Sequence, residues 1–242
     1  MNALGGQTGI VTGASSGIGR AIALGLATQG VTLGVVGRNL EALSAVVEAA
    51  GSAEAHVRCY RADLTEDGDI SELASRLRHD FASIDILIHS AGIYALGHLA
   101  TAPVAEFDWQ HRVNVRAPYA LTQALLPRLR PRRGQIVFIN SSAGLGARAN
   151  VGQYAATKHA LKAVADSLRE EVNSEGIRVL SVFPGRTATP LQSVVHEKEG
   201  RPYKPGRLMQ PEDVAAVVIN ALSLPWTAEV TEISIRPFLK PD

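Results

Sequence analysis

The chain has 242 residues, of which 46% are hydrophobic and 19% charged, a composition typical of one domain with a sizeable core. Its 24 basic and 23 acidic residues are interspersed, so neither nucleic acid nor a membrane surface is an expected partner. A single cysteine excludes an intrachain disulfide and a cysteine-rich zinc site, and no metal site is expected. With no apolar run long enough to span a bilayer, these features predict a soluble protein of the reducing cytoplasm.

Short apolar runs alternate along the chain with longer segments of helical period. Strands are expected at 8–11, 32–36, 56–60, 84–89, 135–140, 178–183 and 232–235. Helices are expected at 17–29, 40–50, 67–79, 104–129, 153–173 and 211–222. The strands are apolar almost throughout, as strands covered on both faces should be. The alternation predicts one α/β domain over residues 1–242, with a doubly wound parallel sheet of about seven strands and helices on both faces.

A glycine-rich segment, Thr12-Gly13-Ala14-Ser15-Ser16-Gly17-Ile18-Gly19, joins the first strand to the first helix. Its glycines permit a sharp turn and a close approach of the backbone to a diphosphate, and the helix N-terminus offers free amides and partial positive charge. The spacing Gly-x-x-x-Gly-x-Gly differs from the fingerprint Gly-x-Gly-x-x-Gly and from a P-loop. The segment predicts phosphate binding, and the alternative is a glycine-rich turn without a ligand.

One segment, residues 186–210, breaks the alternation of strands and helices. It contains three prolines, two glycines and the charged stretch His196-Glu197-Lys198-Glu199. A long irregular insertion in a compact domain is usually a lid or a poorly ordered surface loop. A substrate lid is favoured here, because the segment follows the end of a strand, where ligands bind in such sheets.

Tyr154 and Lys158 are four residues apart on an expected helix, so their side chains project from the same face. A positive charge about 4 Å from a phenolate stabilises it by roughly 4 kcal/mol at an effective dielectric constant near 20. That energy corresponds to about three pKa units and moves a tyrosine from about 10 towards neutrality. Such a phenol can exchange a proton with a substrate oxygen. Taken alone, the pair also suits an ordinary solvated helix face.

Further motifs follow in a fixed order: Asp63, the turn His89-Ser90-Ala91-Gly92, Asn114, Ser141, and Pro184-Gly185. With the glycine-rich segment and the Tyr–Lys pair, this set resembles the short-chain dehydrogenase/reductase family over essentially the whole chain. The resemblance implies a Rossmann-type fold, a nicotinamide cofactor, and hydride exchange between a carbonyl and an alcohol. It departs from the family at His89 and Ser90, which stand where two asparagines are usual.

The resemblance implies a role for each catalytic residue. Tyr154 is the expected general acid/base, and Lys158 lowers its pKa and holds the nicotinamide ribose. Ser141, thirteen positions before the tyrosine, is expected to hydrogen-bond the substrate oxygen, with Ser142 as a competing candidate. Asn114 is expected to bend its helix and to hold a water in a proton relay that reaches Lys158.

The resemblance also implies cofactor contacts from four places at the ends of strands. Asp63 is expected to contact the adenine, the alternative being a cap for the next helix, and Thr189 to contact the carboxamide. Arg186 and Thr187 replace residues that are usually apolar. The implied cofactor-binding residues are Gly13, Ser15, Ser16, Gly17, Ile18, Gly19, Ala62, Asp63, Leu64, Ser90, Ala91, Gly92, Tyr154, Lys158, Pro184, Gly185, Thr187 and Thr189.

The end of the second expected strand indicates which nicotinamide cofactor is used. Members that prefer NAD place a carboxylate there, which accepts bonds from the ribose 2′-hydroxyl. This chain reads Val35-Val36-Gly37-Arg38-Asn39, with no carboxylate and with an arginine that can pair with a 2′-phosphate. The segment therefore favours NADP over NAD, with Arg38 and Asn39 at the cofactor; the alternative for Arg38 is an ordinary solvated charge.

The leading interpretation is an NADP-dependent oxidoreductase that acts on a small ketone or secondary alcohol, in a pocket that includes Tyr94, Leu145 and Val151. One alternative is a β-ketoacyl thioester reductase that meets an acidic carrier protein through a basic cluster, Arg128, Arg130, Arg132 and Arg133. A regulator that senses NADP without turnover is disfavoured, because the Tyr–Lys pair is kept.

The family resemblance implies a homotetramer or dimer, assembled through the expected helices at 104–129 and 153–173. The second of these helices carries an apolar stripe, which suits either a partner subunit or the core of the monomer. The stripe consists of Leu161, Val164, Leu168 and Val172.

Overall fold

The computed structural model describes residues 3–51 and 56–239. Within them, seven strands form one sheet in which every neighbouring pair is parallel, in the order β3-β2-β1-β4-β5-β6-β7. The predicted single α/β domain with a doubly wound parallel sheet is confirmed. The strands are β1 (Thr8–Thr12), β2 (Thr32–Gly37), β3 (Val57–Arg61), β4 (Ile86–His89), β5 (Gln135–Ile139), β6 (Arg178–Pro184) and β7 (Glu232–Ile235).

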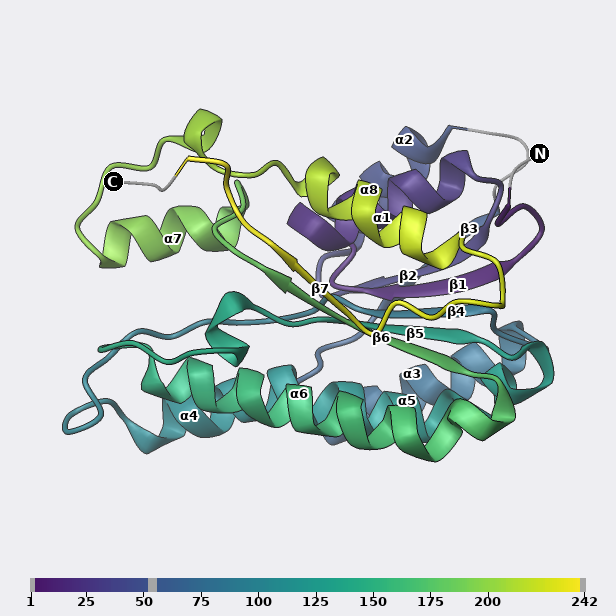
Figure 1. Ribbon diagram of the computed structural model, residues 1–242, viewed down its shortest axis with the longest axis horizontal. Coiled ribbons are helices and arrows are strands. Elements are labelled where there is room, and N and C mark those ends of the chain that lie inside the picture. The colour runs from purple at the N-terminus through teal and green to yellow at the C-terminus, as the bar shows by residue number, and fades with distance from the viewer. Residues whose placement is uncertain (1–2, 52–55, 240–242) are drawn as a thin grey trace.

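Helices cover both faces of the sheet (Figure 1). One face carries α1 (Gly17–Thr28), α2 (Leu40–Ala50) and α8 (Pro211–Leu222). The other face carries α3 (Asp67–Asp80), α4 (Val104–His111), α5 (Ala117–Leu129) and α6 (Gly152–Val172). Neighbouring residues of a central strand enter opposite cores, as Val137 and Phe138 do. The inner strands β1, β2, β4, β5 and β6 are buried at nearly every position and are mainly apolar, whereas the edge strands β3 and β7 are partly exposed and carry charged residues.

The expected helix at 104–129 is present, but it is not one regular α-helix. A π-helical turn, Arg112–Arg116, separates α4 from α5. Pro118, four residues after Asn114, has no amide hydrogen to continue the helical ladder there. The Asn114 side chain also pairs with the backbone of Ile93, since it accepts from the amide and donates to the carbonyl, both at 2.9 Å. The turn lies where the family resemblance implies a bend.

The segment 186–210 is more regular than expected, because it contains α7 (Pro190–Lys198) and a short 3-10 turn at Pro205–Arg207. Thr189 caps α7 by accepting a hydrogen bond from the Gln192 amide at 3.1 Å, and Pro190 fits the first helical position. The proline therefore begins a helix here. This helix lies beyond the carboxyl ends of the strands (Figure 1).

The apolar stripe of α6 packs mainly inside the monomer. Leu161 and Val172 are buried in the core beneath the sheet, and Leu168 packs against the same cluster. These three side chains therefore support the core rather than a partner surface. Among residues 3–51 and 56–239, no helix is both long and apolar enough to cross a membrane.

Candidate functional site

A cleft of about 690 Å³ opens at the carboxyl ends of the strands, walled by the glycine-rich segment, the turns after β4, β5 and β6, and α7. All of the site residues predicted from the sequence line this cleft except Asn39 and Asn114. Asn39 is instead the N-cap of α2, where its side chain accepts a hydrogen bond from the Ala42 amide at 3.1 Å. The other predicted site residues come from segments far apart in the chain, and the fold brings them together in one cleft.

The glycine-rich segment turns sharply into α1. Gly13 and Gly17 have φ angles of 67° and 54°, in the left-handed region that favours glycine. A Cβ atom on Gly19 would lie 2.3 Å from the Gly13 carbonyl oxygen, so only glycine fits this contact. Ser16 is the N-cap of α1 but its side chain makes no capping bond, and the first turn holds no acidic residue. This uncapped, acid-free helix end fits a phosphate anion.

The turn after β4 is tied to this segment by the Thr12 hydroxyl. Its oxygen accepts hydrogen bonds from the Ser90 and Ala91 amides at 3.2 and 3.3 Å, and it lies 3.3 Å from the Ile88 carbonyl, to which it donates. Thr12 was not predicted as a site residue. The sequence does contain a signal for this role, because Thr12 is a hydroxyl residue at the last position of an otherwise apolar strand. From there its bonds connect the end of β1 to the end of β4.

His89, one of the two departures from the usual asparagines, points away from the cleft into the core. Its Nε2 lies 2.8 Å from the Thr122 hydroxyl, and its ring stacks on Phe138 with centroids 5.0 Å apart. Burial lowers the pKa of His89 to about 3. The ring is therefore neutral at physiological pH and braces the central strand against α5.

The buried His89 should make the fold sensitive to acid. Because its pKa falls from 6.5 to about 3 on folding, the stability that it contributes is complete above pH 6.5 and is lost as pH falls towards 3. The His89→Gln variant keeps a group that can bond Thr122 but cannot be charged. Between pH 6.5 and 4 its free energy of unfolding should fall less steeply than that of the wild type, by about 1 kcal/mol per pH unit.

Urea unfolding at several pH values measures this difference, with exposed His98→Gln as the control. Equal acid sensitivity of the wild type and the His89→Gln variant would contradict the argument.

Ser141, Tyr154 and Lys158 meet on one wall of the cleft. Ser141 follows β5 and its Oγ accepts a hydrogen bond from the Ala143 amide at 3.1 Å, while Tyr154 and Lys158 come from successive turns of α6. The Ser141 side chain acts on the Tyr154 phenol and lowers its pKa, against the larger effect of burial. Of the two candidate serines, Ser141 is thus the one that acts on the phenol, and Ser142 is exposed.

Burial dominates the electrostatics of the Tyr–Lys pair. It raises the pKa of Tyr154 to about 12, with the Ser141 side chain acting in the opposite direction. It lowers the pKa of Lys158 to about 8. Lys158 Nζ donates to the Ile139 carbonyl at 3.1 Å and lies 5.8 Å from the centre of the Tyr154 ring. The predicted lowering of the Tyr154 pKa by Lys158 is therefore not found, because the ammonium faces the ring and a carbonyl.

Asn140 is a positioning residue that the sequence analysis missed. Its Oδ1 accepts from the Ser141 amide at 2.9 Å, and its Nδ2 donates to the Lys158 carbonyl at 3.0 Å. One buried amide thus fixes the turn that carries the serine against the helix that carries the lysine. The available signal was a buried asparagine at the end of an otherwise apolar strand, where a polar group needs partners.

Asn114 lies behind the wall formed by these residues. Its Nδ2 donates to the Thr157 hydroxyl at 3.1 Å, and that hydroxyl donates to the Tyr154 carbonyl at 2.8 Å. A Cβ atom on Gly92 would lie 3.6 Å from Asn114 Oδ1 and 3.7 Å from Lys158 Nζ. The amide of Asn114 and the ammonium of Lys158 therefore approach the same point, although Asn114 does not line the cleft.

Arg38 and Asp63 lie at the other end of the cleft, after β2 and β3. Asp63 Oδ1 accepts hydrogen bonds from the amide and the hydroxyl of Thr65, at 3.0 and 2.9 Å. The bond from the Thr65 amide is the main cause of a lowered Asp63 pKa, to which Arg38 and Arg61 also contribute. Asp63 therefore lines the cleft and shapes its own turn, whereas Arg38 forms no ion pair with any described residue.

The two threonines after β6 both have partners within the chain. The Thr187 hydroxyl donates to the Gly185 carbonyl at 3.1 Å, and the Thr189 hydroxyl caps α7. A Cβ atom on Gly17 would lie 2.9 Å from Thr189 Cγ2, so this threonine packs directly against the glycine-rich segment. Both threonines line the cleft after β6, in the segment that the sequence analysis assigned to cofactor contacts.

Comparison with known proteins agrees with this arrangement. Residues 7–200 match the family model described as short chain dehydrogenase. The chain belongs to the short-chain dehydrogenase/reductase family. It is 34% identical to an uncharacterized short-chain type dehydrogenase/reductase of Sinorhizobium fredii over 96% of this chain and 91% of the relative. It is 32% identical to an uncharacterized oxidoreductase of Staphylococcus epidermidis, over 96% and 97% of the two chains.

A solved structure gives the same picture for this short-chain dehydrogenase/reductase. The solved structure is that of a metagenomic short-chain oxidoreductase in complex with NADP. That protein is 30% identical to this chain, and the two structures match with a TM-score of 0.83 over 98% of this chain and all of the other. The protein is accordingly an NAD(P)-dependent oxidoreductase. Its uncapped α1 terminus and close-packed glycines fit the diphosphate of a nicotinamide cofactor.

Proposed function

We propose that this enzyme exchanges hydride between NADP(H) and a ketone or secondary alcohol, with Tyr154 as the general acid/base. The observation that carries the proposal is that Ser141, Tyr154 and Lys158 converge on one wall of the cleft. With its pKa raised to about 12, the phenol holds its proton at neutral pH. It is therefore prepared to donate that proton to a carbonyl oxygen, which is the reductive direction.

Each residue of this wall has a distinct task in the proposal. Because Ser141 Oγ already accepts from the Ala143 amide, its own hydrogen is available to donate to the substrate oxygen. Lys158, whose pKa is lowered to about 8, keeps a positive charge at neutral pH and would hold the ribose hydroxyls next to the phenol. Asn140 and Asn114 hold this wall in place through α6. The nicotinamide cofactor supplies the hydride chemistry when it is bound.

NADP is the proposed cofactor because Arg38 lines the cleft and forms no ion pair with any described residue. The Arg38→Asp variant should lose at least about 10-fold in kcat/KM with NADPH, since a charged hydrogen bond contributes roughly 1.5–3 kcal/mol, and should gain with NADH. The matched control is Arg61→Asp, which changes a nearby arginine that does not line the cleft. Equal efficiencies with NADPH and NADH in the unmodified enzyme would contradict the assignment.

The basic cluster that favoured a carrier-protein substrate lies at the opposite edge of the sheet. Arg130 pairs with Glu175, and Arg132 pairs with Asp85 just before β5. Arg128 donates to the Arg78 carbonyl in α3 at 3.0 Å and to the Ala82 carbonyl just after α3 at 3.2 Å. Because these cations are engaged far from the cleft, we favour a small-molecule carbonyl over an acyl-carrier thioester.

The segment 186–210 is proposed to be a substrate lid. Leu191, Gln192 and Val195 of α7 line the cleft opposite the Ser141 turn. This placement supports the lid, because the helix covers the part of the cleft next to the proposed acid. A cytoplasmic location remains a prediction from the composition, and assembly into a homotetramer or dimer remains a prediction from the family resemblance.

A further inference from the structure

A pair of opposite charges lies inside the cleft, with Arg186 just after β6 and Glu199 at the end of α7. Arg186 Nη2 donates to both carboxylate oxygens, at 2.9 and 2.7 Å, and the two side chains are only 23% and 19% exposed. Arg186 Nη1 lies 3.4 Å from His196 Nε2, which can accept because Nδ1 of that ring lies 2.8 Å from the Gln192 carbonyl. The pair is thus fixed to α7 and borders the cleft.

The ion pair is close to the proposed acid, and Tyr94 connects the two. The Tyr94 ring meets the Tyr154 ring edge-on, with centroids 4.8 Å apart. Burial is the main cause that raises the pKa of Tyr94 to about 12, and the charges of Glu199 and Arg186 act on the same phenol. The pair therefore lines the same cleft as Tyr94 and Tyr154, whose rings are in contact.

The pair retains hydrogen-bonding capacity that the protein does not use. Among residues 3–51 and 56–239, nothing accepts a hydrogen bond from Arg186 Nε, and the Glu199 oxygens have further lone pairs. Ile93, Leu191 and Val195 make the neighbouring lining apolar. An ion pair in such surroundings costs stability relative to an apolar pair of the same shape, so a ligand that uses its free groups would explain its presence.

A hydroxyl group matches this pair, because it can donate to Glu199 and accept from Arg186 at the same time. Glu199 repels a carboxylate, Arg186 repels an ammonium, and a hydrocarbon chain would leave both charges without a new partner. We propose that Arg186 and Glu199 determine specificity by selecting a neutral carbonyl substrate that carries a hydroxyl group away from its reacting carbonyl. This inference rests on the proposed function.

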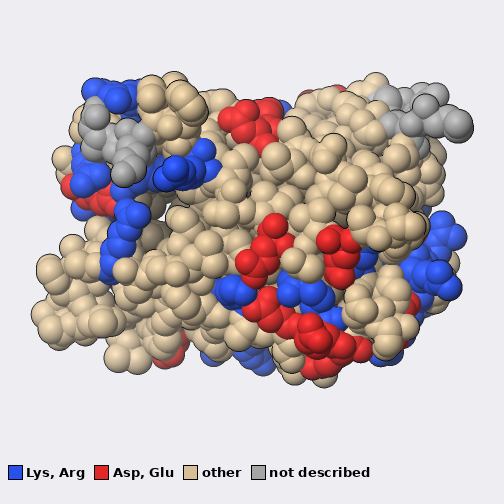
Figure 2. Space-filling model, viewed as in Figure 1, with Lys and Arg blue, Asp and Glu red and all other residues tan. Residues whose placement is uncertain are grey.

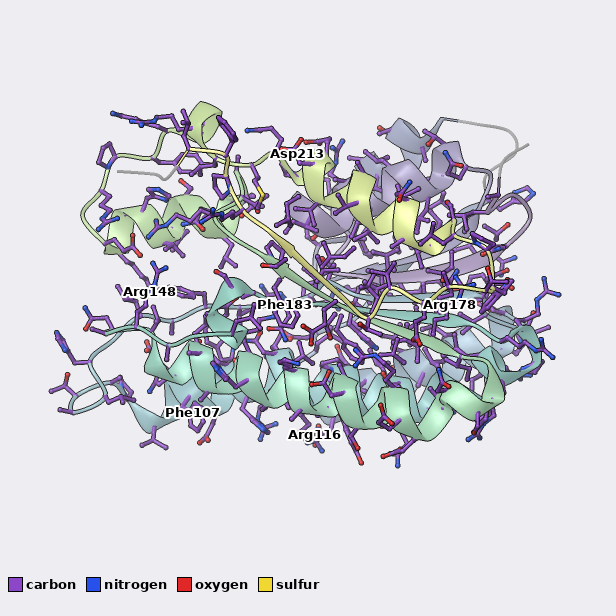
Figure 3. All side chains as sticks on the ribbon, in the orientation of Figure 1. Phe107, Arg116, Arg148, Arg178, Phe183 and Asp213 are labelled. Atoms are coloured by element: carbon purple, nitrogen blue, oxygen red, sulfur yellow. The ribbon has the colours of Figure 1, made fainter. Side chains whose placement is uncertain are left out.

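The charge around the cleft mouth raises an opposing possibility. Lys and Arg side chains gather at the upper left of the molecule, over α7 and the loop that follows it (Figure 2). Arg148, which is exposed and lines the cleft, lies between α7 and α4 (Figure 3). These cations would favour an anionic substrate. Deeper in the cleft, however, Glu199 pairs with Arg186 at 2.7 Å and also lies 3.9 Å from Arg201 Nε, so its carboxylate opposes a second carboxylate beside Arg186.

The test uses three series of methyl ketones, four to seven carbons long, that end in a methyl, a hydroxyl or a carboxylate group. With NADPH, the best hydroxyl-ended ketone should exceed its methyl-ended counterpart by about 10- to 100-fold in kcat/KM. Calorimetric binding of the same ketones to the Tyr154→Phe variant with NADP gives a second readout that needs no turnover. That variant should show the same order of affinities.

Two variants assign the preference to the ion pair. In the double variant Arg186→Met with Glu199→Leu, the preference for hydroxyl-ended ketones should fall to within about threefold, while methyl-ended ketones are still reduced. The single variant Glu199→Gln keeps the shape of the side chain and should lower the preference even if the double variant folds poorly. Glu197→Gln is the control, because Glu197 is exposed on the same helix and does not line the cleft; it should leave the preference unchanged.

The possible outcomes separate this inference from the proposed function. Turnover of methyl-ended ketones without a preference for hydroxyl, a best rate with carboxylate-ended ketones, or a preference that survives in both variants would overturn the inference alone. If the wild type bound NADPH but no ketone were reduced or bound, the proposed function would fail, and the inference with it.

Discussion

The Tyr154→Phe variant should lose about 100- to 10,000-fold in kcat for ketone reduction, the range that a positioned general acid contributes. The phenol oxygen is the only atom removed, so the ring remains against Tyr94 and the wall keeps its shape. Affinity for NADPH should change by less than about threefold, because the loss lies in proton transfer. Stopped-flow measurement of NADPH oxidation and fluorescence titration of the cofactor give the two quantities.

The matched control for this variant is Tyr119→Phe. Tyr119 lies on α5, is 54% exposed and does not line the cleft. The control should keep its full rate. A Tyr154→Phe enzyme that still turned over at the wild-type rate would show that the proton comes from another group, and the assigned role would have to be abandoned.

The Gly19→Ala variant should lose most of its cofactor affinity, at least about 10-fold, and about 1–3 kcal/mol of its free energy of unfolding. The new Cβ would lie 2.3 Å from the carbonyl oxygen of Gly13. Gly13 cannot withdraw, because it has a positive φ and a Cβ atom built there would already lie 2.7 Å from the Ala91 backbone. The added methyl must therefore displace the segment that shapes the uncapped end of α1.

Gly68→Ala provides the comparison for this second variant. Gly68 lies in the first turn of α3, and a Cβ atom there would have no neighbour within 4 Å. The control should bind NADPH normally, and alanine in a helix should leave it at least as stable. Calorimetric titration and thermal unfolding measure both effects. Unchanged NADPH affinity in Gly19→Ala would mean that the close contact between the two glycines does not shape the phosphate site.

The sheet, and the wall of the cleft with Ser141, Tyr154 and Lys158, could be predicted from the sequence because both depend on strong local signals. Buried parallel strands are apolar on both faces, so a mainly apolar run such as residues 135–139 predicts a buried strand. Ser141 and the Tyr–Lys pair follow from spacing and from family motifs. Strand order and parallel pairing then bring distant segments to one edge, so the cleft is a consequence of the topology.

Features that depend on tertiary partners were not accessible from the sequence in the same way. The interruption at Arg112–Arg116 depends on how Asn114 meets the loop after β4, and the beginning of α7 depends on the Thr189 cap. The pKa of Tyr154 depends on burial and on where the Lys158 ammonium points, which helical spacing alone does not define. Asn140 acquires its importance only from the two elements that its amide joins.

The wide turn between α4 and α5 has a consequence for how this chain tolerates changes in length. A π-helical turn accommodates one surplus residue, and each residue of a regular helix advances the chain by about 100° around its axis. Removing a single position within the π-helical turn Arg112–Arg116 would convert it into regular α-helix and leave α4 facing as it does now, whereas the same deletion in a regular helix would rotate everything before it by about 100°. The turn therefore lets this stretch lose one residue without turning α4 away from the core, and the cost falls on Asn114, whose bonds to the Ile93 backbone depend on the wide turn.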